Sequence, residues 1–108
     1  MTRVRFSADE KGLYGFEISG HSSEDGDDEI GKIVCAAVSS AAYMAANTVT
    51  EIIGDMAEVF VDDAVMRFYV KNPSECTVKV LEGLRLHLTE LSEQYGSNIR
   101  IYGGARNA

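Results

Sequence analysis

The sequence predicts an α+β fold, in which two helices pack on one face of a largely antiparallel sheet. Two observations carry this prediction. Two pairs of short segments alternate apolar and polar residues, as half-buried strands do, and each pair is followed by a longer segment with helical apolar spacing. One more alternating segment follows, so the expected order is strand–strand–helix–strand–strand–helix–strand. The 108 residues show neither a repeat nor a linker, and we expect one layered domain over 1–108.

The first hairpin should join a strand at 2–7 to a strand at 13–19 through a turn at 9–12. Gly12 closes this turn, where a positive φ is readily adopted. The alternation directs one set of side chains toward the core: Val4, Phe6, Tyr14, Phe16 and Ile18.

Residues 20–31 have no apolar period, and five of the twelve are acidic, so we expect a loop. The acidic positions do not follow the twelve-residue calcium-loop pattern, so no metal site and no cofactor is expected.

A helix is predicted from about Gly31 to the stop residue Gly54, because the run is uncharged from Ile33 to Thr50. A membrane span is the alternative for this run. Polar residues and many alanines interrupt it, so we favour a buried core helix and expect no membrane association. A helix apolar nearly all round should be covered by the sheet on one side and by a second helix or subunit on another.

The second hairpin is predicted at 56–61 and 65–70, with a tight turn at Asp62-Asp63. One face of its first strand carries Ala57, Val59 and Val61, and one face of its second carries Met66, Phe68 and Val70.

The second helix is expected to start with Asn72 as its cap, Pro73 in its first position and Glu75 in its third, and to end at Gly96. Its inward stripe should be Val80, Leu84, Leu88, Leu91 and Tyr95. A last strand at 98–102 and a frayed tail from Gly103 complete the prediction.

The charge and the cysteines restrict the function. A formal net charge of −7 argues against direct nucleic-acid binding, which needs a basic face. Two cysteines do not form a disulfide framework, and the start of the chain has the pattern of a strand rather than a signal peptide. We therefore expect a cytoplasmic protein with free thiols.

Cys35 and His21 are the candidates for chemistry. If the long helix begins near Gly31, Cys35 lies in or next to its first turn, where free N–H groups and the helix dipole favour a thiolate. His21 follows the second strand, and the intervening chain can fold back to Cys35. An inert, buried Cys35 is the alternative. His87 is expected at the surface or at its boundary with the core, and Cys76 is expected to serve packing.

The residues Gly20-His21, Gly31 and Ile33-Val34-Cys35-Ala36-Ala37-Val38-Ser39 resemble the signature of the ribosomal-processing cysteine protease family, which are small bacterial proteins. The length and element order are also similar, so the resemblance covers essentially the whole chain. It implies a cysteine endopeptidase domain that removes the N-terminal extension of a large-subunit ribosomal protein precursor during ribosome maturation. It also implies a homodimer.

Carried onto this chain, the resemblance makes Cys35 the nucleophile and His21 the general base. Ser39, Gly20 and Gly31 are supporting residues, with Ser39 as a hydrogen-bonding neighbour. The chain departs from the usual motif at two positions. Lys32 stands where an Asp usually precedes Ile-Val-Cys, and Ser22 stands where Ala usually follows the His.

These departures leave the role of the missing Asp open. One of Asp27, Asp28 or Glu29 can replace the missing Asp, or nothing does. A lysine near the site favours a thiolate. The alternative functions are a non-catalytic ribosome-associated binding or assembly factor of the same fold, and a small structural protein with an inert Cys35.

Overall fold

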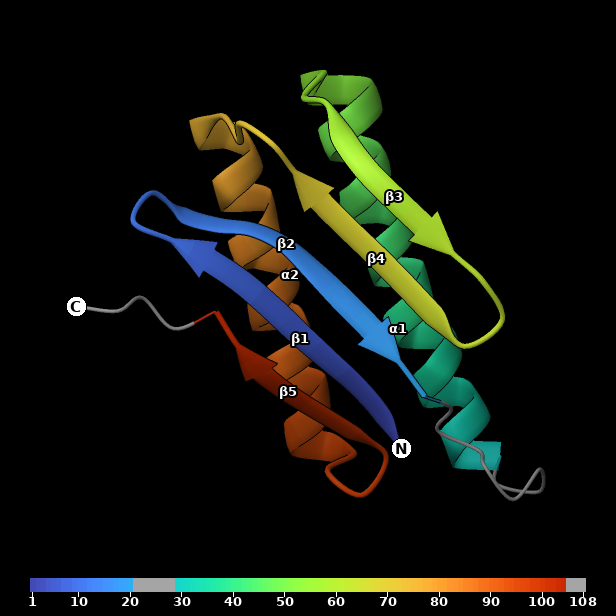
Figure 1. The fold of residues 1–108 in the computed structure, drawn as a ribbon. Coiled ribbons are helices and arrows are strands. Elements are labelled where there is room, and N and C mark those ends of the chain that lie inside the picture. The colour runs from blue at the N-terminus through green and yellow to red at the C-terminus, as the bar shows by residue number, and fades with distance from the viewer. Residues whose placement is uncertain (21–28, 105–108) are drawn as a thin grey trace.

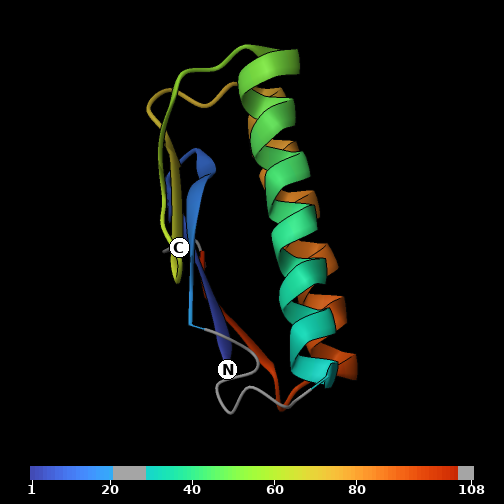
Figure 2. The same cartoon turned by 90° about the vertical axis from the view of Figure 1, so that its right-hand side faces the viewer.

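The computed structural model describes residues 1–20 and 29–104. It confirms the predicted fold class: the sheet forms one layer, and both helices pack on the same face of it (Figure 1, Figure 2). In chain order the elements are β1 (Thr2–Asp9), β2 (Gly12–Ser19), α1 (Glu29–Asn47), η1 (Thr48–Ile53), β3 (Ala57–Val61), β4 (Val65–Val70), α2 (Glu75–Gln94) and β5 (Ile99–Gly103).

The described residues form a five-stranded sheet in the order β3-β4-β2-β1-β5. Both predicted hairpins are present, because β1 pairs antiparallel with β2, and β3 pairs antiparallel with β4. The hairpins meet where β2 pairs antiparallel with β4. β5 pairs in parallel with β1, so the first and last strands of the fold are neighbours. The sheet is therefore largely antiparallel, as predicted.

A bulge near the start of β2 overturns the prediction that Tyr14 points inward. The register pairs Ser7 with Gly15 and Ala8 with Leu13, so Tyr14 has no partner in β1. An extra residue shifts the alternation by one, which turns Leu13 into the core, where it is 3% exposed. Tyr14 instead lies with Tyr69 on the outer face, at 6.3 Å between ring centroids.

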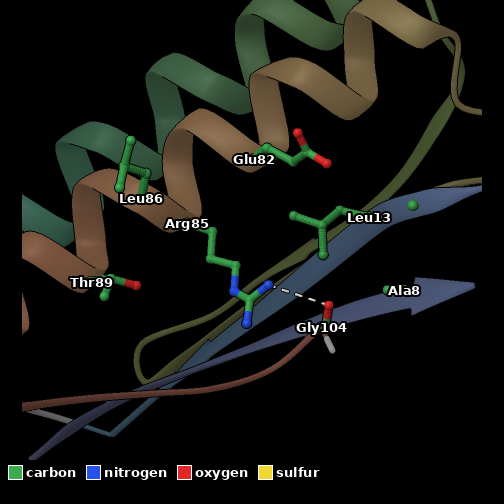
Figure 3. A pocket seen from close by; sticks show the side chains of 8 residues that line it. Ala8, Leu13, Glu82, Arg85, Leu86, Thr89 and Gly104 are labelled. Carbon is green, nitrogen blue, oxygen red and sulfur yellow. Dashed lines mark hydrogen bonds between the residues drawn. The ribbon is translucent and has the colours of Figure 1, made fainter. Parts of the chain in front are cut away.

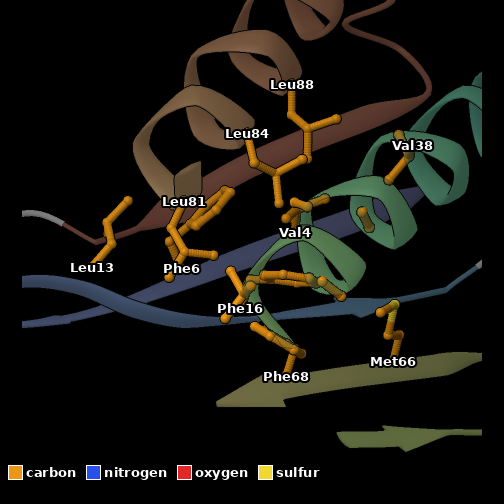
Figure 4. Close-up of a cluster of buried hydrophobic side chains, with 14 of the residues drawn as sticks. Val4, Phe6, Leu13, Phe16, Val38, Met66, Phe68, Leu81, Leu84 and Leu88 are labelled. Carbon is orange, nitrogen blue, oxygen red and sulfur yellow. The ribbon is translucent and has the colours of Figure 1, made fainter. Parts of the chain in front are cut away.

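The core lies between the sheet and the two helices (Figure 4). Phe16 and Phe68 stack at 5.4 Å between ring centroids, and Phe6 lies 6.2 Å from Phe16. Burying one large apolar side chain contributes about 1.5–3 kcal/mol, so this sheet-centred cluster is a main source of stability. The fully buried members from the helices are Val34, Val38, Ala42, Val49, Leu81 and Leu88.

α1 begins two residues earlier than predicted, at Glu29, and continues into the π-helical turn η1. Gly54 ends η1 in the left-handed conformation, with φ of 89°, as the sequence predicted. By length and hydropathy, residues 29–53 could cross a membrane. Their buried valines pack in the core described above, which supports a core helix.

α2 is capped by Ser74, and the prediction of Asn72 as its cap is wrong. The Ser74 hydroxyl accepts from the Thr77 N–H at 3.3 Å. The Asp55 carboxylate accepts from the Ser74 N–H at 2.8 Å and from the Thr77 hydroxyl at 2.6 Å. Thr77 is buried within this hydrogen-bond network. The inward stripe of α2 is centred on Leu81, whereas the sequence pattern predicted Val80.

Two further predictions about the second half of the chain need correction. Cys76 is exposed in the first turn of α2 and does not serve packing. β5 extends to Gly103, so that residue belongs to the sheet rather than to a frayed tail. The remainder of the predicted tail, 105–108, lies outside the described residues.

Candidate functional site

Cys35 is the seventh residue of α1 and is half-buried. The expectation that it lies in or next to the first turn is therefore wrong. Amide groups beyond the first four residues of an α-helix donate within the helix, so the Cys35 N–H is engaged by the helix itself. The dipole effect is also confined largely to the first turn. A thiolate at Cys35 needs a base rather than a helix end.

Ser39 follows Cys35 by one helical turn, and Tyr43 follows Ser39 by another. All three line a cavity of about 130 Å³ between α1 and the sheet. Val38 of α1 also lines it. The remaining lining comes from β1, from β2 and the residue after it, and from the β3–β4 hairpin: Thr2, Ile18, Gly20, Val61, Asp62, Asp63, Ala64, Val65 and Met66. The mostly apolar wall and the thiol together suit a peptide side chain beside a nucleophile.

The β3–β4 turn forms one wall of this cavity and is held by Asp62. The Asp62 carboxylate accepts from the N–H of Ala64 at 3.0 Å and from the N–H of Val65 at 3.1 Å. The Asp62 N–H donates to the Val65 carbonyl at 2.9 Å, which closes the hairpin. The turn predicted at Asp62-Asp63 is confirmed, and a carboxylate stabilises it in place of a glycine.

Gly20 forms the rim of the cavity at the end of β2. Its φ is 82°, and a Cβ at this position would lie 2.5 Å from the Met1 carbonyl oxygen. Its N–H donates to the Ala64 carbonyl at 3.1 Å, which fixes it beside the β3–β4 turn. Only glycine combines this φ with this close approach. The structure thus explains the motif glycine in physical terms.

His21 lies outside the described residues, as do Ser22, Asp27 and Asp28. The structure therefore brings Cys35, Ser39 and Gly20 together and leaves the pairing of Cys35 with His21 as a prediction.

The other predicted residues are distributed along α1 and α2. Gly31 is buried in α1, whereas Glu29 is exposed in its first turn. Lys32 is exposed and is not part of the cavity lining, so nothing in this geometry supports its action on the thiol. His87 is exposed on α2, as predicted.

A larger hollow of about 620 Å³ lies between α2, the β1–β2 hairpin and Gly104 (Figure 3). There the Arg85 guanidinium donates to the Gly104 carbonyl at 3.3 Å. The described residues that line the hollow include neither cysteine nor histidine. We therefore assign the candidate site to the smaller cavity at Cys35.

Sequence reasoning missed two parts of the site. Tyr43 continues the Cys35–Ser39 spacing by one turn, so the helical period could have identified it. The contribution of Val61, Asp63 and Ala64 depends on how the β3–β4 hairpin folds beside α1, for which the sequence has no local signal.

Comparison with protein families gives a match over residues 1–100 to the family described as cysteine protease Prp. No curated protein matches the chain.

Among solved structures, the ribosomal processing protease Prp of Staphylococcus aureus with a substrate peptide is similar, with a TM-score of 0.85 and 18% identity. That match covers 95% of this chain and 99% of the other. The same protease with a covalently linked product peptide has a TM-score of 0.81, with the same identity and coverage. SMU.848 from Streptococcus mutans has a TM-score of 0.84 and 19% identity, over 99% of this chain and 96% of that one. At these identities the likeness establishes the fold.

Proposed function

Because the chain belongs to the cysteine protease Prp family, we propose that it is a cytoplasmic cysteine endopeptidase that removes the N-terminal extension of a large-subunit ribosomal protein. One observation carries the proposal. Cys35 and Ser39 line a single cavity with Gly20, the residue immediately before His21. Gly20 thus brings the described chain to the rim of the cavity that holds the thiol, one residue before His21 in the sequence. The similar Staphylococcus aureus structures hold a substrate peptide and a covalently linked product peptide, which supports a peptide substrate.

The proposed reaction is acyl transfer through a thioester. His21 takes the proton of the Cys35 thiol, and the sulfur attacks the carbonyl carbon of the scissile peptide. His21 then gives this proton to the amine as the C–N bond breaks. Water, deprotonated by His21, hydrolyses the thioester and restores the thiol.

Three residues support this chemistry in the proposal. Ser39 offers a hydroxyl one turn from the sulfur, as a hydrogen-bonding neighbour. Gly20 allows the close approach of the chain to the Met1 carbonyl, and Gly31 is buried near the start of α1. We do not assign the Cys35 N–H as a donor to the oxyanion, because this group donates within the helix.

The second candidate function is a ribosome-associated binding factor that holds the same ribosomal protein without cutting it. The exposed Lys32 favours this candidate, because an Asp usually occupies that position in the family motif. A missing acidic partner leaves a histidine base without a group to orient it.

Incubation of the protein with a synthetic peptide of the ribosomal extension, followed by mass spectrometry, tests the proposal. We expect cleavage at one bond, complete loss of cleavage in Cys35→Ala and full activity in Cys76→Ala, which removes the other thiol. Binding of the peptide without cleavage would select the binding factor. Equal activity of Cys35→Ala and the native protein would exclude Cys35 as the nucleophile.

We further propose that the protein acts as a homodimer joined through the outer face of its helices. A groove of about 720 Å³ runs there between α1 and α2 and is lined by Ala37, Ser40, Ala41, Met44, Ala45, Thr48, Val80, Gly83, Leu84 and His87. The small side chains on α1 allow close approach of a second helix. Ile33 and Met44 on this side of α1 are 60% and 66% exposed, and they add apolar surface beside the groove.

A further inference from the structure

β3 is an edge strand that lacks the usual protection of such edges. It lies at one end of the sheet order, and its sequence is Ala-Glu-Val-Phe-Val. Natural edge strands are commonly protected by charged residues, proline or a bulge. β3 contains neither proline nor a bulge, and its one charged residue, Glu58, pairs with Tyr69 on the outer face of the sheet. An unprotected apolar edge is a template for pairing with another strand.

The hairpin register shows which backbone groups of β3 face outward. Asp62 and Val65 form a hydrogen-bonded pair, and such pairs alternate with non-hydrogen-bonded pairs along an antiparallel ladder. Glu58 and Phe60 therefore direct their N–H and C=O groups toward β4. The N–H and C=O groups of Val59 and Val61 point to the open edge.

The side chains of the same two valines face the helix layer. Val59 pairs with Phe68 and Val61 with Met66, and both partners are buried beneath the helices. Nevertheless, Val59 and Val61 are 53% and 48% exposed. Tyr43 of α1 is 45% exposed and lines the Cys35 cavity together with Val61. We call the exposed apolar surface formed by Val59, Val61 and Tyr43 the slot. Through Val61 and Tyr43 it adjoins the cavity that holds the thiol.

Charge indicates what occupies this edge. The turn at the end of β3 carries Asp62 and Asp63, and the whole chain has a net charge of −7. A second copy of the chain would bring the same negative charge to the edge. A basic peptide is complementary to it.

We propose that the peptide substrate binds as an added strand on the free edge of β3, with its backbone paired to Val59 and Val61. Alternate side chains of this basic, apolar-containing peptide enter the slot between β3 and Tyr43, and the chain then passes into the cavity at Cys35. Backbone pairing supplies affinity, and the slot selects apolar residues at every second position. The inference rests on the proposed function, because it takes the peptide substrate from there.

Backbone N-methylation of the peptide tests this pairing and leaves the protein unchanged. Binding of the ribosomal extension peptide to Cys35→Ala is measured by fluorescence anisotropy, with one N-methyl group placed at each position in turn. A methyl group removes one donor and obstructs the edge. We expect affinity to fall by about tenfold at alternate positions and to stay within about twofold at the positions between.

A paired protein variant gives the converse test. Val59→Pro removes an outward N–H and leaves the ladder to β4 intact, since proline is tolerated where the N–H faces away from the sheet. We expect binding about tenfold weaker for Val59→Pro than for Val59→Thr, which also alters the side chain but keeps the N–H. Thermal unfolding of both variants shows that they fold.

Four results would overturn the inference. They are a flat N-methylation profile, unchanged binding by a folded Val59→Pro, a Val59→Pro variant with altered oligomeric mass, and absence of peptide binding. Cleavage by the native protein is measured in parallel. Cleavage with a flat profile removes the inference and keeps the proposed protease. An alternating profile without cleavage keeps the strand addition and removes the protease.

Discussion

The carboxylate of Asp55 accepts a 2.6 Å hydrogen bond from the hydroxyl of Thr77, and this contact joins the segment after η1 to the first turn of α2. The Thr77 hydroxyl is the largest cause that lowers the pKa of Asp55 from its ordinary 3.8, followed by the Ser74 N–H. Burial acts in the opposite direction, and the Ser74 hydroxyl adds a further lowering contribution.

Asp55 should therefore make stability depend on pH. Its pKa is lower in the folded state, so its contribution is complete above the ordinary carboxyl range and is lost as pH falls through the folded-state pKa. We expect Asp55→Asn to lower the urea midpoint at pH 7 and to differ less from the native protein at pH 3. Asp63→Asn, at an exposed turn position, is the control. A difference in urea midpoint between Asp55→Asn and the native protein that grows on acidification would contradict this assignment.

Thiol reactivity separates the nucleophile from an inert cysteine. Cys76 is exposed and Cys35 is half-buried, so access alone would make Cys76 react faster. If Cys35 is held as a thiolate by a base, alkylation at pH 6.5 should be roughly tenfold faster at Cys35. Peptide mapping after iodoacetamide treatment measures both rates in one sample. Faster reaction at Cys76 would leave Cys35 without evidence of activation.

Gly20→Ala should damage both stability and the site. Its φ of 82° and the 2.5 Å approach to Met1 cost an added Cβ about 1–3 kcal/mol of unfolding free energy. We also expect reduced cleavage, because the displaced chain leads into His21. Gly83→Ala is the matched control. A Cβ there meets nothing within 4 Å in this chain, and helix propensity should raise stability by about 1 kcal/mol. Equal effects of the two changes would contradict the close-approach argument.

Met44→Glu should convert the proposed homodimer to a monomer. It places a charge in the α1–α2 groove, where Met44 is 66% exposed in the single chain and so leaves its fold intact. The molar mass measured by light scattering after size exclusion should be half that of the native protein, while the circular dichroism spectrum stays unchanged. Glu90→Gln on α2, outside the described lining of the groove, is the control. A native protein that is monomeric at high micromolar concentration would exclude this interface.

The element order and most of the core follow from the sequence, because alternation and helical spacing are local signals. Failures occurred where one contact outside the pattern decided the outcome. Tyr14 faces outward because a bulge inserts one residue, and the sequence has no local mark for that insertion. Ser74 caps α2 in place of Asn72 because Asp55, from another part of the chain, fixes it there.

The site was predictable to a smaller extent. A motif identified Cys35, Ser39 and Gly20, and the fold brings them to one cavity. The position of Cys35 within the helix was predicted wrongly, because Glu29 was assigned to the loop. An acidic residue is favourable in a first helical turn, and α1 begins at Glu29. The walls contributed by the β3–β4 hairpin follow from tertiary packing, which periodicity does not encode.

The parallel pairing of β1 with β5 has a consequence for how the protein is made. A ribosome releases β1 first, yet its second neighbour in the sheet is not synthesised until residues 99–103. During elongation β1 is an open edge, and the partly made sheet must avoid pairing with other chains. Because β1 and β5 lie near opposite ends of the chain, their pairing also raises the contact order, which slows folding. The nascent chain thus keeps this edge of β1 unpaired until its last strand emerges, and in that interval the edge is open to pairing with another chain.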